Sequence, residues 1–414
     1  MLYLNSIFKA SAILGFLSVE ATCLPRAAAA NGSTGSGIVA STYFAGYHVN
    51  KGFPVADMPF EKYTDVKYAF AETEPDGSLN LTQSAPDQIP AFVSAAKSKG
   101  VKAMISIGGW TGSRYFSSMF GSAENRTAFV KTCLDLVNQY KLDGLDFEPR
   151  LQRDQQGRHR QLPLLPPGAA QRHHGQVPVA DRRRLPVPWY GPDGASSTDL
   201  GGFASVLDYV MIMNYDIYGA WAATAGPNAP LAFGCDARNN QGGGKEGVAK
   251  WAAAGLPMNR LVLAVPAYSH SFSVTPAAAF PNGTAGPLSA YPAQNSSNRL
   301  QGGSWDSDPP IDPCGNPQPH SGTWTFRAMI EEGKFLDAQG NPAKGMATGY
   351  DNCSQTPFLY DESRQTWISY DNVQSFTAKG QYVKSSGLAG FATFEAGGDY
   401  KNILVDAIRA AVGL

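Results

Sequence analysis

Two carboxylic acids stand two residues apart in the stretch Leu145-Asp146-Phe147-Glu148. Because successive side chains of a β-strand point to opposite faces, Asp146 and Glu148 share one face and Leu145 and Phe147 share the other. Two acids on one face could move a proton or stabilise a positive charge in a bound substrate. This pattern suits a strand of a parallel barrel, whose chemistry lies at the carboxyl ends of the strands. A surface strand with solvated acids would read the same way.

Two further apolar runs end in glycine or polar residues that could take part in a site. The run Val101–Trp110 contains Ser106-x-Gly108-Gly109, and its glycines allow a substrate or a neighbouring loop to approach the backbone closely. The run Leu207–Tyr218 ends in Met213-x-Tyr215-Asp216, and polar residues at the end of an apolar strand favour a site over a core position. For Met213 alone, core packing is an equally good interpretation.

These ordered stretches resemble the signature strands of the family 18 glycoside hydrolases, which include the chitinases. The acidic signature of that family reads Asp-x-x-Asp-x-Asp-x-Glu, and the chain follows it from Asp143 through Phe147. It then departs, because Glu148-Pro149-Arg150 stands where Asp-Trp-Glu is expected. Either two residues are missing and Glu148 is the glutamate of the signature, or Glu148 takes the place of the third Asp and Arg150 that of the Glu.

The resemblance implies hydrolysis of β-1,4 bonds between N-acetylglucosamine units, most of all in chitin, by a retaining mechanism that the substrate assists. The glutamate would protonate the leaving oxygen, and the acetamide oxygen of the substrate would attack the anomeric carbon to form an oxazolinium ion. A neighbouring Asp would orient the acetamide, and a Tyr would donate a hydrogen bond to its carbonyl. The residues carried over to these catalytic roles are Glu148, Asp146, Asp143 and Tyr215.

The resemblance also predicts a sugar-binding cleft that needs no metal and no organic cofactor. Aromatic rings there would pack on sugar faces. Phe394 stands where the family often has Trp and would provide a smaller apolar floor. The predicted substrate-binding residues are Tyr47, Phe70, Gly109, Trp110, Met213, Asp216, Tyr268 and Phe394. The expected ligand is chitin or a chitooligosaccharide.

The break in the signature displaces the glutamate along the strand, and the size of this displacement bears on activity. In the intact signature the Glu follows the second Asp by four residues, but Glu148 follows Asp146 by two. Glu148 therefore still points inward, but it lies about 6.6 Å lower along the strand at about 3.3 Å per residue. General acid catalysis needs a reach of about 2.6–3.2 Å. Two alternatives to a chitinase follow: a catalytically inactive chitin-binding protein of the same fold, and an endo-β-N-acetylglucosaminidase acting on glycoprotein glycans.

The elements that must position these residues fit one α/β domain, a TIM (β/α)8 barrel over residues 38–414. A small α+β insertion, about residues 270–385, is expected between strands 7 and 8. The predicted strands and helices are Val39–Tyr47, Asp65–Phe70, Pro86–Lys99 (helix), Val101–Trp110, Glu124–Tyr140 (helix), Leu207–Tyr218, Glu246–Ala254 (helix), Leu256–Tyr268, Asn372–Ser386 (helix) and Leu388–Glu395.

The region that should hold strand 5 is aberrant. Residues 149–188 contain eight Arg, seven Pro and six Gln but no aromatic residue, Lys, Glu, Ser or Thr. A structureless stretch of this length is uncommon inside a compact barrel. We interpret it as gene sequence translated out of frame after Phe147, which would also explain the broken signature. A genuine, disordered insertion is the alternative.

The remaining features predict a secreted monomer. Lys9, an apolar run of about ten residues and small residues at 27–30 read as a signal peptide over residues 1–30. A flexible linker follows at 31–37, and no run is long enough to span a membrane. A net charge of −1 gives no indication of a nucleic-acid partner. Six Asn-x-Ser/Thr acceptor sites support secretion, at Asn31, Asn80, Asn125, Asn282, Asn295 and Asn352.

The cysteines of a secreted chain are expected to form disulfides rather than to bind metal. Cys23 would leave with the signal peptide, so that Cys133, Cys235, Cys314 and Cys353 remain. Since Cys314 and Cys353 both fall in the expected insertion, we predict a bridge between them.

Overall fold

The computed structural model describes residues 37–149, 174–176, 200–204, 206–283, 286–306 and 319–414. The predicted signal peptide, nearly all of the predicted linker and Cys314 lie outside the described residues. The aberrant segment lies outside them as well, apart from Pro149 and residues 174–176.

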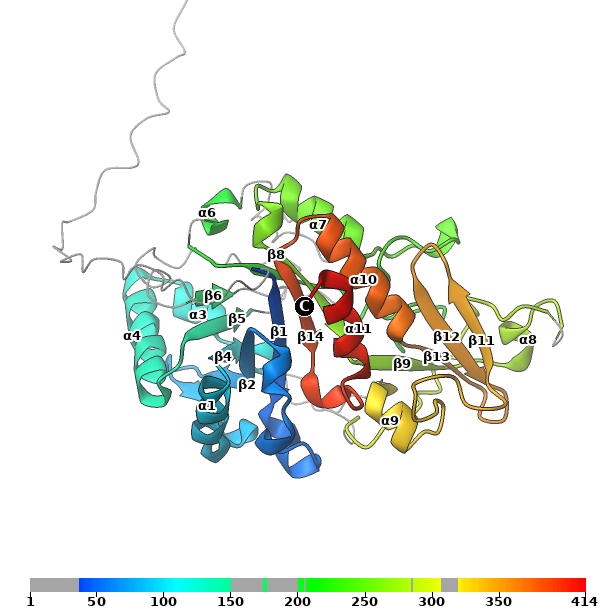
Figure 1. Cartoon of the computed structure of the whole chain (residues 1–414), viewed down its shortest axis with the longest axis horizontal. Helices are drawn as coiled ribbons and strands as arrows, with labels where there is room; N and C mark the ends of the chain where they lie inside the picture. Colours follow the sequence, from blue (N-terminus) through cyan, green and yellow to red (C-terminus); the bar gives the residue numbers. More distant parts are fainter. Residues whose placement is uncertain (1–36, 150–173, 177–199, 205, 284–285, 307–318) are drawn as a thin grey trace, which may run out of the picture. The chain divides into compact units, whose positions relative to one another are not determined.

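A curled sheet of parallel strands forms the centre of the fold, as predicted for a (β/α)8 barrel. Its order is β6-β5-β4-β2-β1-β14-β8-β7, and β3 pairs antiparallel with β2. The strands are β1 Val39–Ala45, β2 Asp65–Thr73, β3 Leu79–Asn80, β4 Lys102–Gly108, β5 Gly144–Glu148, β6 His174–Gln176, β7 Val210–Met213, β8 Leu261–Pro266 and β14 Gly390–Phe394. Strand β14 (orange to red) lies beside β1 (blue) in Figure 1, which brings the two ends of the barrel sequence together.

In the described part of the strand-5 region, residues 174–176 form the short strand β6. Its three residues pair parallel with β5, from Gly144 opposite His174 to Asp146 opposite Gln176. The sequence of this region shows no strand pattern, yet these three residues pair with β5. Backbone hydrogen bonds to β5 depend little on side-chain type, so a strand can form without an apolar pattern.

The four predicted helices are present with boundaries shifted by a few residues, and further helices occur as well. They are α1 Ile89–Ser98, α2 Gly109–Gly112, α3 Phe116–Phe120, α4 Ala123–Tyr140, α6 Gly201–Ala204, α7 Gly244–Ala253, α10 Val373–Ser385 and α11 Ile403–Val412. Ser122 caps α4 by accepting a hydrogen bond from the Asn125 amide, and Asn372 and Ser375 form a capping box at α10. Helices α10 and α11 pack side by side (Figure 1).

Short 3-10 helices occupy many of the connections. They are η1 Gly46–Lys51, η2 Val55–Asp57, η3 Phe60–Lys62, η4 Thr82–Ser84, η5 Pro86–Gln88, η6 Ala237–Asn239, η7 Met258–Arg260 and η8 Ala396–Gly398. The first of them carries Tyr47 just beyond the carboxyl end of β1.

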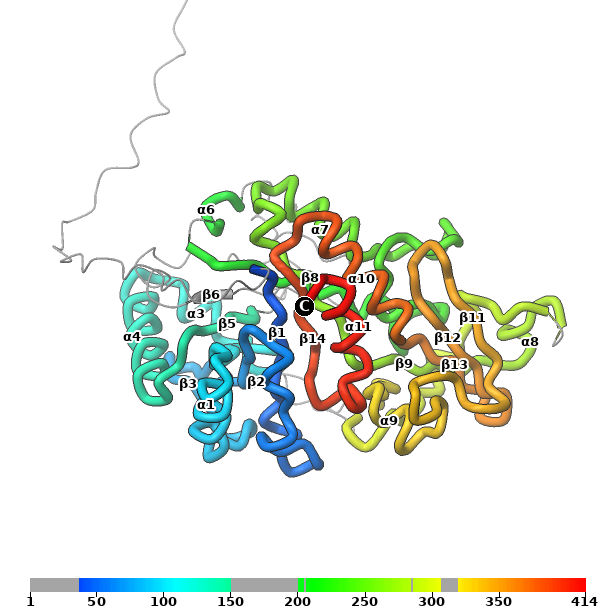
Figure 2. The backbone as a smooth tube through the Cα atoms, in the orientation of Figure 1, coloured from blue at the N-terminus to red at the C-terminus, as the bar shows by residue number. Residues whose placement is uncertain are grey.

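An antiparallel sheet stands between β8 and β14, as the expected insertion requires. Its order is β10-β9-β13-β12-β11, and the chain enters it directly from β8 (Figure 2). Its elements are β9 Tyr268–Ser273, α8 Pro276–Ala279, β10 Thr323–Thr325, α9 Phe326–Glu331, β11 Ala347–Asp351, β12 Thr356–Asp361 and β13 Thr366–Ser369. Aromatic side chains are frequent in two of its strands, with Phe358 and Tyr360 in β12 and Trp367 in β13.

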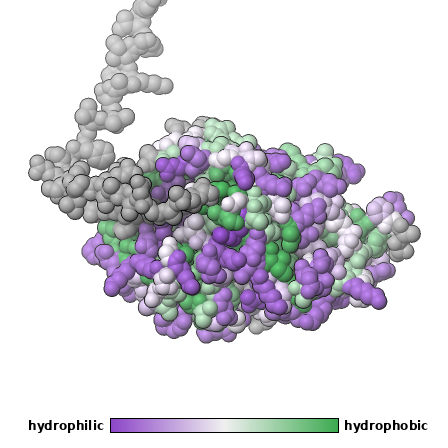
Figure 3. Space-filling model, in the orientation of Figure 1, coloured by the Kyte–Doolittle hydropathy of each residue, from purple (hydrophilic) through white to green (hydrophobic). Residues whose placement is uncertain are grey.

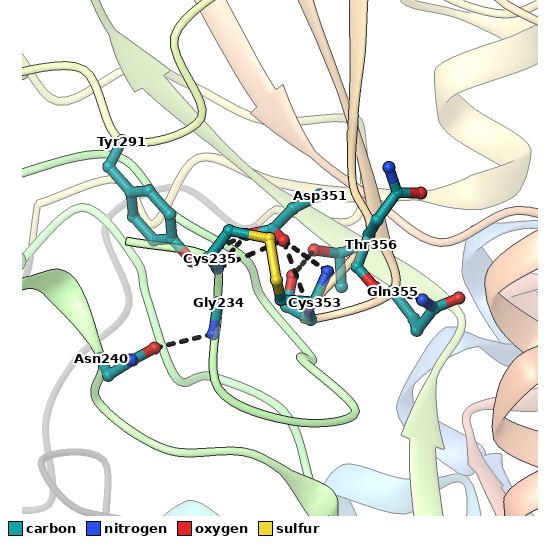
Figure 4. The surroundings of a disulfide bond; sticks show 10 residues. Gly234, Cys235, Asn240, Tyr291, Asp351, Cys353, Gln355 and Thr356 are labelled. Atoms are coloured by element: carbon teal, nitrogen blue, oxygen red, sulfur yellow. Dashed lines mark hydrogen bonds between the residues drawn. A yellow bond between two sulfur atoms is a disulfide. The ribbon is translucent and has the colours of Figure 1, made fainter. Parts of the chain in front are cut away.

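The disulfide differs from the predicted one. Cys353 bonds to Cys235, which precedes it by 118 residues, so the predicted Cys314–Cys353 bridge is wrong (Figure 4). The bond joins the long connection after β7 to the turn between β11 and β12. Shared membership of the expected insertion suggested Cys314, whereas the folded chain brings a residue from outside the insertion next to Cys353. Cys133 is a free, buried thiol on α4.

The core has an inner and an outer part. The inner cluster fills the barrel and consists of Tyr43, Ala69, Tyr209, Met211, Met213, Val262, Ala264 and Ala392. A larger cluster packs the outer strand faces against the helices. The surface seen in Figure 3 is mainly hydrophilic, with separate hydrophobic groups. In the described part of the chain, no helix combines the length and the apolar character needed to cross a membrane.

Candidate active site

Asp146 lies at the centre of the site and is completely buried. Strand β5 presents it to the barrel interior, opposite Ser106 of β4. One of its carboxylate oxygens, Oδ2, accepts hydrogen bonds from Ser106 Oγ at 2.6 Å and from Tyr43 Oη at 3.2 Å. Burial raises the pKa of Asp146 to about 6, although Lys67 and these two hydrogen bonds lower it in part. The other oxygen, Oδ1, has no hydrogen-bond partner among the described residues.

Glu148 is the last residue of β5 and points into the barrel, like Asp146. Burial raises its pKa well above the usual range, and the nearby charges of Asp146 and Asp216 raise it further. Its surroundings therefore favour the protonated form of the acid more than water does. Its Oε2 is buried without a hydrogen-bond partner in the described part of the chain, so it is free to bond to a ligand.

Asp143 does not belong with these two acids. It precedes β5, at the amino end of the barrel, where its Oδ2 accepts a hydrogen bond from the Ala103 amide at 2.9 Å. Its Oδ1 lies 3.4 Å from Lys97 Nζ. The structure thus gives Asp143 a place in joining β5 to the start of β4 and to α1, not a place beside a substrate.

The last residue of β4, Gly108, and the next residue, Gly109, allow close packing beneath the site. Gly108 has a φ of +108°, and a Cβ atom there would lie 2.3 Å from the Glu148 carbonyl oxygen. Gly109 has a φ of +78°, and a Cβ atom there would lie 3.0 Å from the Phe70 ring. Any larger residue would push the end of β5 or Phe70 out of place. The predicted role of Gly109, close approach of backbone, is consistent with this packing.

A second polar group lies at the end of β7. Asp216 has a φ of +56°, and its Oδ1 lies 2.8 Å from both Tyr268 Oη and His270 Nε2. Tyr215 stands beside it, and burial together with the charge of Glu148 raises the pKa of the Tyr215 phenol well above its usual range. The Tyr215 hydroxyl is buried and lacks a hydrogen-bond partner among the described residues. Tyr215 is thus a neutral donor held close to Glu148.

Aromatic rings surround the acids. Phe394, at the end of β14, lies 5.2 Å from the Tyr43 ring, 6.1 Å from the Tyr215 ring and 6.3 Å from the Tyr268 ring, measured between centroids. Tyr47 stacks on Phe70 at 6.4 Å with an interplanar angle of 13°. Apolar surface of this kind suits the faces of sugar rings.

Two large aromatic side chains are left accessible. Tyr47 is 37% exposed and Trp110 is 36% exposed, the latter on the short helix α2 just after β4. Exposed aromatics beside a buried acidic group suit ligand binding more than core packing.

Two predicted residues have different surroundings from those expected. Met213 is 4% exposed and belongs to the inner cluster, so core packing describes it. Tyr268 does not end the seventh strand of the barrel: β8 ends at Pro266, and Tyr268 begins β9 of the insertion. Tyr268 nevertheless reaches the site through its bond to Asp216.

Sequence reasoning missed several contributors. Tyr43 and Ser106 hold Asp146, and His270 contacts Asp216. His270 stands two residues after Tyr268, so the two side chains point to the same face of a strand, and strand alternation could have identified His270. Lys67 could have been noticed as a charged residue inside an apolar strand.

A metal site is not supported by the described residues. One group there has suitable spacing, namely Cys235, Asp351 and Cys353. Its two sulfur atoms are bonded to each other, and Asp351 accepts hydrogen bonds from the amides of Cys353 at 2.8 Å and Ser354 at 3.2 Å. These amide donors satisfy the hydrogen-bonding capacity of the Asp351 carboxylate without an ion (Figure 4).

Comparison with known proteins gives one family. The profile of the family described as Glycosyl hydrolases family 18 matches residues 40–399. A protein of Moniliophthora roreri named chitinase-like effector is 40% identical over 385 residues, which cover 91% of this chain and 93% of the relative.

Two solved structures extend the comparison. The chitinase RmChi1 of Rhizomucor miehei superposes with a TM-score of 0.76 at 27% identity, over 90% of this chain and 100% of the other. A GH18 chitinase of Cycas revoluta, solved in complex with (GlcNAc)3, superposes with a TM-score of 0.68 at 20% identity, over 91% of this chain and 100% of the other.

Proposed function

The chain belongs to family 18 of the glycosyl hydrolases, and from this premise we propose that it binds oligosaccharides of β-1,4-linked N-acetylglucosamine without cleaving them. The ligand lies at the carboxyl end of the barrel, over Asp146 and among the rings of Tyr215, Tyr268 and Phe394. The name of the relative from Moniliophthora roreri, chitinase-like effector, is in keeping with a protein that resembles a chitinase without being one.

The level of Glu148 carries this proposal. In the ladder between β4 and β5, Glu148 pairs with Gly108, two residues beyond the Ser106–Asp146 pair and on the same face of the sheet. It therefore takes the place of the third Asp in the family signature, and the place of the acid falls to Arg150. An arginine is not deprotonated in proteins and cannot protonate a leaving group. The Glu148 carboxyl lies about 6.6 Å below that place, well beyond the reach of proton transfer.

The groups that remain can bind an acetamido sugar. Asp146 accepts a hydrogen bond from the acetamide N–H, and the Tyr215 hydroxyl donates one to the acetamide carbonyl. Both have an unpartnered oxygen for this among the described residues, Oδ1 and Oη respectively. Glu148, in its protonated form, donates to a sugar oxygen. Phe394 provides the floor on which the sugar ring packs.

Calorimetric titration with tetra-N-acetylchitotetraose tests the proposal, together with product analysis of the same mixture. We expect binding and an intact tetrasaccharide. The change Trp110→Ala should weaken binding about tenfold, or about 1.4 kcal/mol, because a large apolar face is lost. Phe233→Ala is the matched control, since Phe233 is 43% exposed but belongs to the loop beside the disulfide. No binding by the unaltered protein, or equal losses in the two variants, contradicts the proposal.

A second candidate is hydrolysis by Glu148 itself, as the first of the two alignments implies. One observation favours it: burial raises the pKa of Glu148 well above its usual range, which favours the protonated form that a general acid needs. This candidate requires turnover of a chromogenic chitooligosaccharide that is abolished by Glu148→Gln. Turnover by the unaltered protein replaces our first proposal with this one.

We also infer that the protein acts outside the cell. The amino-terminal signal pattern, the six glycosylation acceptor sites and a disulfide between Cys235 and Cys353 are mutually consistent with secretion.

A further inference from the structure

A buried charged pair lies inside the barrel, below the candidate site. Lys67 of β2 is completely buried, and its Nζ lies 2.9 Å from Asp65 Oδ1. Asp65 also accepts hydrogen bonds from Ser41 Oγ at 2.5 Å and Tyr209 Oη at 2.8 Å. Burial of these charges is costly, so their position calls for an explanation beyond filling space.

The ammonium group of Lys67 lies between two tyrosine rings. Its Nζ is 5.4 Å from the centroid of Tyr43 and 5.6 Å from that of Tyr209. Both distances are within the range of a cation–π contact. Tyr43 is also the residue opposite Lys67 in the β1–β2 ladder, and its hydroxyl donates to Asp146. Lys67 thus contacts the ring whose other end holds Asp146.

The ladders place Lys67 directly below the site. Ala69 of β2 pairs with Ser106 of β4, which pairs with Asp146 of β5, whereas Lys67 pairs with Met104. Lys67 is therefore two residues, or about 6.6 Å, nearer the amino end of the barrel than Asp146.

The titratable groups around Asp146 are acids and tyrosines, apart from Lys67. The acidic groups are Asp65 from β2 and Glu148 from β5, and the tyrosines facing the acids are Tyr43, Tyr209 and Tyr215. Lys67 supplies the positive charge that acts on Asp146.

We propose that Lys67 is a positioning residue of the sugar site: from inside the barrel it fixes the ring of Tyr43, whose hydroxyl holds Asp146 for the ligand. The inference rests on the proposed sugar binding only for its consequence, which is that Asp146 can accept the acetamide N–H near neutral pH. Lys67 itself does not touch the ligand.

A second buried lysine offers a matched control. Lys379 of α10 is also completely buried and lies 2.5 Å from Asp371 Oδ1. It has the same chemistry and burial as Lys67 but belongs to an outer helix. Any general effect of losing a buried Lys–Asp pair should therefore appear in both Lys67→Met and Lys379→Met.

The first measurement is the titration of Asp146 in the ligand-free full chain, followed by NMR of ¹³Cγ-labelled aspartate. Asp146→Asn identifies the resonance. We expect the midpoint for Asp146 to rise by about one pH unit or more in Lys67→Met, which is a tenfold change in its proton affinity. Lys67→Arg should retain a midpoint close to that of the unaltered protein, and Lys379→Met should leave it unchanged. Lys67→Gln, which can still donate to Asp65, serves if Lys67→Met does not fold.

The second measurement is the pH dependence of tetra-N-acetylchitotetraose binding. Near pH 6 the affinity of Lys67→Met should be lower than that of the unaltered protein by up to about tenfold, with a smaller difference at pH 8. An Asp146 midpoint that is the same in Lys67→Met or Lys67→Gln as in the unaltered protein overturns the inference. Absence of binding by the unaltered protein overturns the proposed function instead, because the ligand-free titration does not depend on it.

Discussion

At the scale of single residues, the site is built at the expense of stability. Asp146 is completely buried, Glu148 is half-buried beside it, and each has one buried oxygen without a hydrogen-bond partner among the described residues. Groups in such surroundings bind ligands well because no internal partner competes for them. The same surroundings disfavour the charged form of an acid, which links the pKa of each acid to the stability of the fold.

Replacing Asp146 should therefore stabilise the protein at neutral pH. Its pKa is about 6 in the folded chain and about 3.9 in an unfolded one, so the folded state binds the proton more tightly. This contribution is fully present below about pH 3.9 and is lost as the pH rises through about 6. Asp146→Asn should raise the free energy of unfolding at pH 8 by up to about 3 kcal/mol. Urea unfolding at pH 8 and pH 4.5 measures the difference.

The gain should shrink at pH 4.5, where Asp146 is already protonated, and sugar binding should weaken at both pH values. Asp143→Asn is the control, because Asp143 is partly exposed and lies away from the site. A gain from Asp146→Asn that does not depend on pH would show that the carboxylate is not destabilised by burial.

At the scale of elements, the insertion completes the site. Strand β9 follows β8 and brings Tyr268 and His270 to Asp216. Asp216 lies three residues after the end of β7. The site thus draws on the barrel and on the antiparallel sheet together. The disulfide between Cys235 and Cys353 joins the same two parts, because Cys235 lies in the connection after β7 and Cys353 in the β11–β12 turn.

Removing this disulfide should weaken the contact between the two parts. The bond closes a loop of 118 residues, and a loop of that length restricts the unfolded chain strongly. Cys235→Ser with Cys353→Ser should lower the free energy of unfolding by about 2–5 kcal/mol. Guanidinium unfolding of the double variant measures it.

Treatment with a reducing agent is the control for this experiment. A reducing agent should produce a loss of stability in the unaltered protein and no further loss in the double variant, although both retain Cys133. Equal stability of the two proteins without reducing agent would contradict a structural role for the bond.

At the scale of the whole molecule, the chain combines an ordered barrel with one aberrant segment. The family profile matches residues 40–399, a range that includes the segment. Strand β6, within the segment, occupies the place of the fifth barrel strand next to β5. The barrel pattern therefore continues on both sides of a stretch whose composition does not follow it.

Sequencing the transcript across residues 140–195 should show a neighbouring reading frame that encodes Trp-Glu-Tyr-Pro after the third Asp, followed by a helix and a strand. A protein made from that frame should hydrolyse chitooligosaccharides, since its Glu would stand four residues after Asp146. The chain as it stands should bind them only. A transcript that reproduces Glu148-Pro149-Arg150 in frame would contradict the out-of-frame interpretation and leave a genuine insertion.

The sequence alone determined the barrel, most of its strands and helices, the insertion and the family. Apolar runs such as Val101–Trp110 report burial on both faces, and their spacing along the chain reports the alternation of strands and helices. These are local properties, so reading along the chain recovers them. Residues that follow a run, among them Asp146, Tyr215 and Phe394, could be assigned to one end of the barrel for the same reason.

Only the tertiary structure decided which residues meet across strands. It joined Cys353 to Cys235 rather than Cys314, moved Asp143 out of the site, and brought His270 into it. It also placed Lys67 beneath Asp146 through the Tyr43 ring. Each of these outcomes depends on register and on contacts between residues far apart in sequence. Local pattern carries no information about such contacts, because strand alternation gives the face of a side chain but not its neighbours.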